Sequence, residues 1–176
     1  MGLSFVHLDD TTRQSMLSEI EIDRAGGTVY VSDYLNEIGR LRWVPLLIQA
    51  AEKGTDDSLA NALRRANCFK IEVAYNKPRG GGTGMRRVPV TASQTLAESQ
   101  FNMYYIRALA LRAIDASQGL FVYRAKTVEV PRPESEAMIG KTLDARVVLQ
   151  VLRDTRGVEP SIDIPMPNTG LTVRLV

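Results

Sequence analysis

The sequence offers few side chains for catalysis or metal binding. Its 176 residues include one histidine, His7, and one cysteine, Cys68. A zinc site built on these two would need carboxylates as its other ligands, which is an uncommon solution. A nucleophile that needs an imidazole base would depend on His7 alone. We interpret Cys68 as a half-buried structural thiol, and we expect no metal, no cofactor and no enzymatic activity.

A glycine-rich basic segment is the clearest candidate for binding. Residues 80–84 contain four glycines, and four cations flank them: Lys77, Arg79, Arg86 and Arg87. A phosphate-binding Walker loop would end in Gly-Lys-Ser/Thr and open a helix, whereas here Met-Arg-Arg-Val-Pro-Val follows. We interpret residues 77–90 as an extended arm that binds a neighbouring protein or, by neutralising phosphates, nucleic acid. A solvated loop without a partner is an equal alternative.

Two further cations, Arg124 and Lys126, lie two residues apart on a predicted strand. A metal-dependent nuclease core would place an acid two residues before such a lysine, because carboxylates hold the catalytic metal. Arg124 occupies that position, so a metal-dependent nuclease is the weakest of our alternatives. We assign Arg124 and Lys126 to the same partner-binding or nucleic-acid-binding surface as the basic segment.

Charge changes sign along the chain. Residues 1–60 carry 5 Lys or Arg against 10 Asp or Glu, whereas residues 61–132 carry 12 against 4. The remaining residues carry 5 against 6, and the whole chain has a formal net charge of +2. This distribution predicts a polarised surface, which suits head-to-tail contacts between copies or binding to a phosphate backbone.

The length and hydropathy predict one domain over residues 1–176. The longest uncharged apolar run, residues 43–51, is far shorter than the roughly 20 residues that a membrane-spanning helix needs. The first ten residues lack the positively charged start of a secretory signal. We therefore expect a protein that is made and kept in the cytoplasm.

The hydrophobic pattern predicts an α+β fold. Apolar or aromatic residues recur at helical spacing from Ala97 to Ile114, which indicates a long amphipathic helix over residues 92–117. We expect this helix to pack on one small sheet, built from strands near residues 69–75, 120–129 and 171–175. The expected flanking elements are helices over residues 10–23, 45–53, 55–66 and 143–153 and an extended piece over residues 28–32.

Three aromatic residues are candidates for an interface. Trp43 is the one tryptophan, and Tyr104 and Tyr105 are adjacent on the long predicted helix. Tyrosine and tryptophan are enriched where proteins meet, so we assign these three side chains as interface anchors. A place in the core is the alternative for each of them.

Several stretches together resemble a known family. They are Lys-Pro-Arg-Gly-Gly-Gly from residue 77, Arg-Val-Pro-Val-Thr-Ala from 87, Ala-Glu-Ser-Gln-Phe-Asn-Met-Tyr-Tyr-Ile-Arg from 97, Val-Tyr-Arg-Ala-Lys from 122, Pro-Arg-Pro-Glu-Ser-Glu-Ala from 131 and Pro-Asn-Thr-Gly-Leu-Thr-Val-Arg-Leu from 167. Over residues 9–175 the chain resembles a family of uncharacterised proteins of tailed phages, prophages and bacterial genomes. The resemblance implies a virion component of the neck between portal and tail, small, ring-forming and rich in extended arms. It assigns no functional residues.

The leading hypothesis is therefore a structural protein of a tailed bacteriophage, a head–tail connector, neck or tail-attachment subunit. Its expected partners are copies of itself in a ring, other virion proteins such as portal, capsid or tail, and packaged DNA, with no membrane contact. Its expected location is the virion, after assembly in the host cytoplasm. The alternative is a nucleic-acid-binding accessory protein that uses the basic segment.

Overall fold

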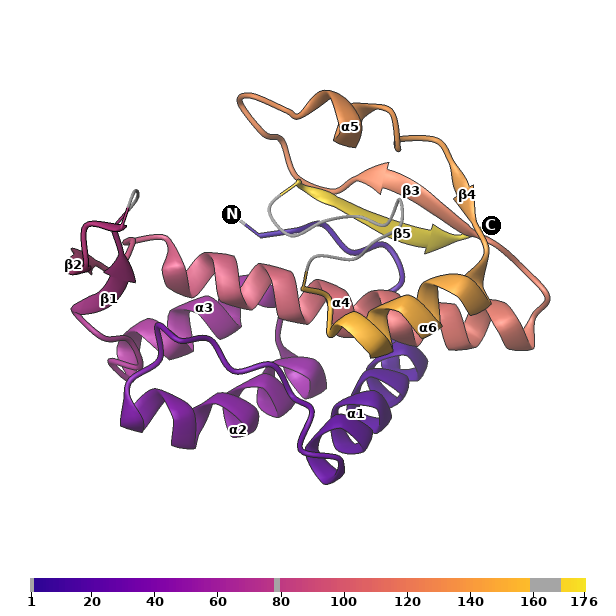
Figure 1. Cartoon of the computed structure of the whole chain (residues 1–176). Coiled ribbons are helices and arrows are strands. Elements are labelled where there is room, and N and C mark those ends of the chain that lie inside the picture. The colour runs from indigo at the N-terminus through magenta and orange to yellow at the C-terminus, as the bar shows by residue number, and fades with distance from the viewer. Residues whose placement is uncertain (1, 78–79, 159–168) are drawn as a thin grey trace.

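A computed structural model describes residues 2–77, 80–158 and 169–176 and has an α+β fold, as predicted (Figure 1). The helices are α1 (Asp10–Ala25), α2 (Glu37–Lys53), α3 (Asp56–Arg65), α4 (Ala92–Asp115), α5 (Pro133–Glu136) and α6 (Ala145–Thr155). The strands are β1 (Glu72–Asn76), β2 (Thr83–Arg87), β3 (Leu120–Arg124), β4 (Thr142–Leu143) and β5 (Leu171–Leu175). Among these described residues, no helix is both long enough and apolar enough to cross a membrane.

The long helix α4 is the centre of the fold and confirms the helix predicted over residues 92–117. Helices α1 to α3 lie on one side of it and the strands β3, β4 and β5 on the other, while α6 also packs against it (Figure 1). All ten residues at 101–110 are buried. An amphipathic helix would expose one face over this stretch. Here α4 is enclosed on several sides because both layers of the protein pack on it.

The main sheet has three antiparallel strands in the order β4-β3-β5. In its register Val122 of β3 lies opposite Val173 of β5. The prediction that residues 69–75 join this sheet is wrong. Strand β1 pairs with β2 instead, because half of the predicted loop returns as a strand and forms a separate hairpin. Gly80 and Gly82, at φ 74° and 79°, supply the left-handed backbone of its turn.

Among the boundaries that differ from the prediction, three have a clear structural cause. Helix α2 begins at Glu37 and contains Pro45, because Asn36 caps it by accepting from the Gly39 N–H at 2.7 Å. Helix α6 begins after Asp144, whose Oδ1 accepts from two backbone N–H groups, while the expected start of the helix lies in β4. Strand β3 ends at Arg124 and not near residue 129, because the N–H groups of Ala125 and Lys126 both donate to the carbonyl of Gly170.

The apolar side chains form one contiguous core. Trp43, Tyr104 and Tyr105 lie within it, each with no exposed surface. The assignment of these three as interface anchors is therefore wrong for the subunit described, because packing inside the subunit already covers them. The core position is the alternative that the structure supports.

Candidate functional site

The structure separates the predicted binding cations into two groups. Lys77, Arg86 and Arg87 lie on the β1–β2 hairpin or its turn and are exposed, and Arg79 lies outside the described residues. Arg124 forms an ion pair with Glu136, and Lys126 Nζ lies 2.6 Å from Glu98 Oε2. Neighbouring carboxylates thus neutralise both cations of the second group. The binding role of the hairpin cations stays a prediction, and Arg124 and Lys126 are less available for such a role.

The described residues of the hairpin are exposed or partly exposed. No residue of β1 or β2 is buried. Three apolar side chains on or beside it are largely exposed: Ile71 at 84%, Met85 at 61% and Val90 at 94%. Arg86 contacts the body of the protein, because its guanidinium lies 3.3 Å from the Tyr34 hydroxyl. Within the hairpin the same group lies 5.8 Å from the Tyr75 ring centre. The hairpin therefore combines cations with apolar surface, which is typical of a binding surface.

The base of the hairpin is firmly held. The N–H of Val88 donates to the carbonyl of Ile71, and the N–H of Lys70 donates to that of Tyr34, both at 2.9 Å. Gly39 of α2 lies directly beneath this segment. A Cβ there would come within 2.1 Å of the Cys68 carbonyl oxygen. Backbone contact of this kind positions the base of the hairpin on α2.

A cleft of about 530 Å³ lies between α3, the base of the hairpin and the start of α4. We call it the basic cleft, because Arg64, Lys70 and Arg87 line it and no acidic residue does so among the described residues. Ile71, Val88 and Val90 add apolar surface, and Ser93 and Cys68 also line it. Burial raises the pKa of the Cys68 thiol, so Cys68 is a poor nucleophile.

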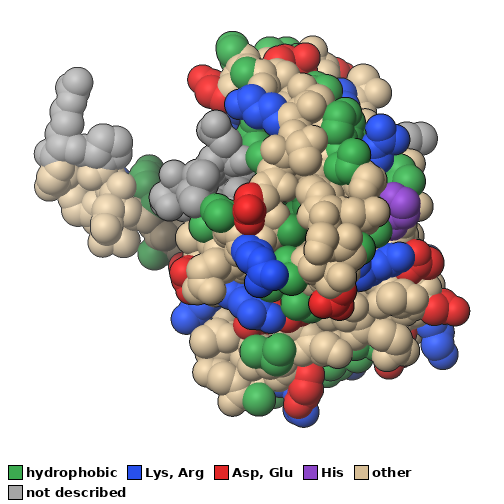
Figure 2. Space-filling view, turned by 90° about the vertical axis from the view of Figure 1, so that its right-hand side faces the viewer, with side chains coloured by type: hydrophobic (Ala, Val, Ile, Leu, Met, Phe, Trp, Pro, Cys, Tyr) green, Lys and Arg blue, Asp and Glu red, His purple; other side chains and the backbone are tan. Residues whose placement is uncertain are grey.

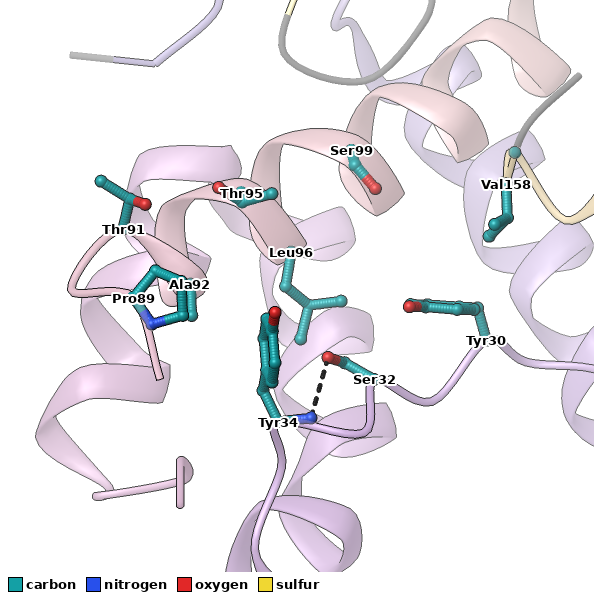
Figure 3. A pocket seen from close by; sticks show the side chains of 11 residues that line it. Tyr30, Ser32, Tyr34, Pro89, Thr91, Ala92, Thr95, Leu96, Ser99 and Val158 are labelled. Atoms are coloured by element: carbon teal, nitrogen blue, oxygen red, sulfur yellow. Dashed lines mark hydrogen bonds between the residues drawn. The ribbon is translucent and has the colours of Figure 1, made fainter. Parts of the chain in front are cut away.

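A second hollow of about 410 Å³ lies on the other side of the chain segment that leads into α4. Thr91, Thr95 and Ser99 follow one face of α4, and Tyr30, Ser32 and Tyr34 face them from the segment before α2 (Figure 3). No charged residue is among its described lining residues. These hydroxyls suit hydrogen bonding to a polar ligand, but the hollow offers no general base. Pro89 and Ala92 line both hollows.

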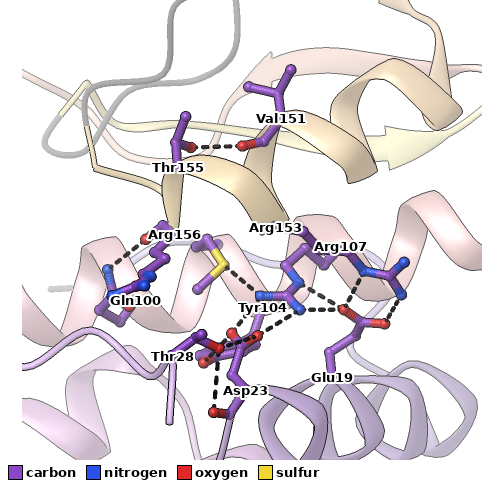
Figure 4. Close-up of polar contacts among 11 residues, drawn as sticks. Glu19, Asp23, Thr28, Gln100, Tyr104, Arg107, Val151, Arg153, Thr155 and Arg156 are labelled. Atoms are coloured by element: carbon purple, nitrogen blue, oxygen red, sulfur yellow. Dashed lines mark hydrogen bonds and ion pairs between the residues drawn. The ribbon is translucent and has the colours of Figure 1, made fainter. Parts of the chain in front are cut away.

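Part of the charge step along the sequence is compensated by ion pairs within the subunit. Arg107 of α4 is fully buried and bonds to two acids of α1, with Nε 2.7 Å from Glu19 Oε2 and Nη1 2.6 Å from Asp23 Oδ2 (Figure 4). Glu19 also binds Arg153 of α6, and Asp9 binds Arg112. On the face shown in Figure 2, acidic and basic side chains are interspersed. The predicted polarised surface is therefore weaker than the sequence indicates, because ion pairs within the subunit join the acidic and basic segments.

The ion cluster predicts a pH dependence of stability. Burial alone would raise the pKa of Glu19, but the hydrogen bond from Arg153 and the charge of Arg107 outweigh it and hold that pKa below its ordinary value. The resulting stabilisation is present above the pKa of the unfolded state and is lost as pH falls through the lower folded value. We expect the urea concentration at the unfolding midpoint to decrease as the pH is lowered below about 5. Glu19→Gln should make this midpoint depend less on pH in that range. An unchanged profile in this variant would contradict the assignment.

Some of the site was not singled out from the sequence. Arg64 and Lys70 come from segments on either side of Cys68, and only the packing of α3 against the hairpin base brings them together with Arg87. The hydroxyls at positions 91, 95 and 99 have a spacing of four that could have indicated a shared helix face. No group of three or more His, Cys, Asp or Glu side chains that could hold a metal occurs in the described part of the chain.

Comparison with known proteins assigns no family to the chain, so the interpretation of the site rests on its geometry. No family model, no curated protein and no solved structure matches this chain significantly.

Proposed function

We propose that this chain is a structural subunit that assembles with further copies of itself, and that the β1–β2 hairpin of one copy binds the next. The observation that carries the proposal is the hairpin itself. Among the described residues its two strands pair only with each other, and neither is buried. An isolated two-stranded hairpin is marginally stable, and its open edges favour further contacts. A partner that covers it would supply the missing packing.

The outer face of α2 is the surface that best complements the hairpin. Glu37, Leu41 and Glu52 share one helical stripe that points away from the core, and Leu41 is 80% exposed. Ile38 adds a second exposed apolar side chain, although Arg40 and Arg42 lie on the flanks of this face. Acids at both ends of an apolar strip match the cations and apolar side chains of the hairpin.

The contact would be heterologous, because the hairpin and the outer face of α2 are different surfaces. In Figure 1 the hairpin projects beyond the start of α4, whereas α2 lies at the lower left of the molecule. Contacts between two different surfaces generate a ring when the rotation from one copy to the next brings the last copy back to the first. A ring in the neck of a tailed-phage virion is the assembly that the resemblance implies, with portal, capsid or tail proteins as its neighbours.

A charge swap tests the proposal. We expect the full chain to form oligomers in light scattering after size exclusion. Lys77→Glu with Arg86→Glu should weaken the association by about tenfold or more, and so should Glu37→Arg with Glu52→Arg. The four changes together should restore oligomers, because opposite charges face each other again.

Arg146→Glu is the matched control, since Arg146 is exposed on α6, away from both surfaces. It should leave the oligomer unchanged. A wild-type chain that stays monomeric at about 100 µM would overturn the proposed contact. So would a variant with all four charge changes that stays dissociated.

A further inference from the structure

The N-terminal end of α4 borders the basic cleft and is not capped by a side chain. Thr91, at the cap position, makes no side-chain hydrogen bond to the helix. None of the hydrogen bonds in the described part of the chain uses the backbone N–H of Ser93 or Gln94. The free N–H groups at the start of a 24-residue helix carry partial positive charge. We infer that this end of the basic cleft binds a phosphate group.

The Ser93 hydroxyl is an independent observation in favour of a ligand. Ser93 lines the cleft and is 3% exposed. Its Oγ is buried and has no hydrogen-bond partner among the described residues. Leaving a buried hydroxyl unpaired costs about 1–3 kcal/mol. A phosphate oxygen at the start of α4 would accept its proton in a hydrogen bond.

Three cations from separate elements complete the site. Arg64 comes from the last turn of α3, Lys70 from the hairpin base and Arg87 from the end of β2. Arg64 donates to Asn61 Oδ1 and Lys70 to the Asp33 carbonyl. Each of the two cations has further N–H donors for a ligand. Glu72 lies opposite Arg87 in the hairpin but does not line the cleft.

The carbonyl end of α3, which would repel an anion, is satisfied by its own chain. The carbonyls of Ala62, Leu63 and Arg64 accept from the N–H groups of Ala66, Cys68 and Asn67. The cations and the start of α4 therefore make the cleft electropositive. The nearby carboxylate of Asp57 does not line the cleft and accepts from the Gln94 side chain at 3.1 Å. The same chemistry suits a free phosphate ion and the phosphate of a nucleic-acid backbone.

The test is a titration of the full chain with inorganic phosphate at low ionic strength, followed through the amide signals of Ser93 and Gln94. We expect both signals to shift. Arg64→Gln should raise the dissociation constant about tenfold, since a charge-assisted hydrogen bond is lost. Ser93→Ala should raise it too while leaving the urea midpoint unchanged or higher, because it removes an unpaired buried hydroxyl.

Arg146→Gln is the control and should bind like the wild type. A second titration with short duplex DNA distinguishes the source of the phosphate. If DNA binds with a salt dependence that Arg64→Gln reduces, the ligand is a nucleic-acid backbone. If only inorganic phosphate binds, the ligand is a small phosphate. Absence of any shift at Ser93 and Gln94 with both ligands would overturn the inference, whatever the oligomeric state of the chain.

Discussion

Arg107→Ala is expected to destabilise the protein by about 3–5 kcal/mol, because it leaves two buried carboxylates without their counter-charge. The guanidinium has no exposed surface. It lies between Glu19 and Asp23 of α1 and 5.2 Å from the ring centre of Tyr104, whose hydroxyl also donates to Asp23 at 2.9 Å. Urea unfolding of the variant and the wild type at neutral pH measures the difference.

Arg24→Ala is the matched control for this change. Arg24 also pairs with an acid of α1, Glu21, but both side chains are more than half exposed. Solvent screens such a pair, so its loss should leave the urea midpoint nearly unchanged. If both variants lose the same stability, the buried cluster does not have the energetic role that its geometry indicates.

Trp43→Ala is the second change with a large expected effect. Trp43 is fully buried in α2, and its Nε1 donates to the carbonyl of Tyr30 at 2.7 Å. Truncating a buried tryptophan destabilises by about 3–5 kcal/mol. The change should also loosen the segment that carries Tyr30 and Ser32, which form one wall of the hydroxyl-lined hollow.

Trp43→Phe separates the two contributions. It keeps most of the apolar volume but leaves the Tyr30 carbonyl without its donor, so we expect a loss of about 1–3 kcal/mol. Trp43 is the one tryptophan of the chain, so its emission in the folded wild type reports directly on the site. Strong quenching by iodide in the folded protein would contradict its burial.

Local patterns in the sequence predicted the elements whose signals are strong. Helix α4 and strand β5 were placed closely, because helical spacing of apolar residues and a C-terminal alternating run are local signals. Strand β2 was missed because Gly84, Arg86 and Arg87 have weak strand preference. Its pairing with β1 depends on a turn that closes at Gly80 and Gly82.

Long-range packing explains the errors in the predicted site. The spacing of apolar residues along α4 did not indicate that Arg107 is buried, yet α1 and the rest of the core enclose it. The basic cleft depends on Arg64, Lys70 and Arg87, which come from three different elements of the chain. Helical or strand periodicity reports one element at a time, so it indicates neither which acids a buried cation meets nor which cations share a cleft.

The buried cluster also has a consequence for biosynthesis. Glu19 binds Arg107 and Arg153, so its two partners emerge from the ribosome long after α1. Until Arg107 has left the exit tunnel, Glu19 and Asp23 lack their buried counter-charge, and Glu19 lacks its second partner until Arg153 follows.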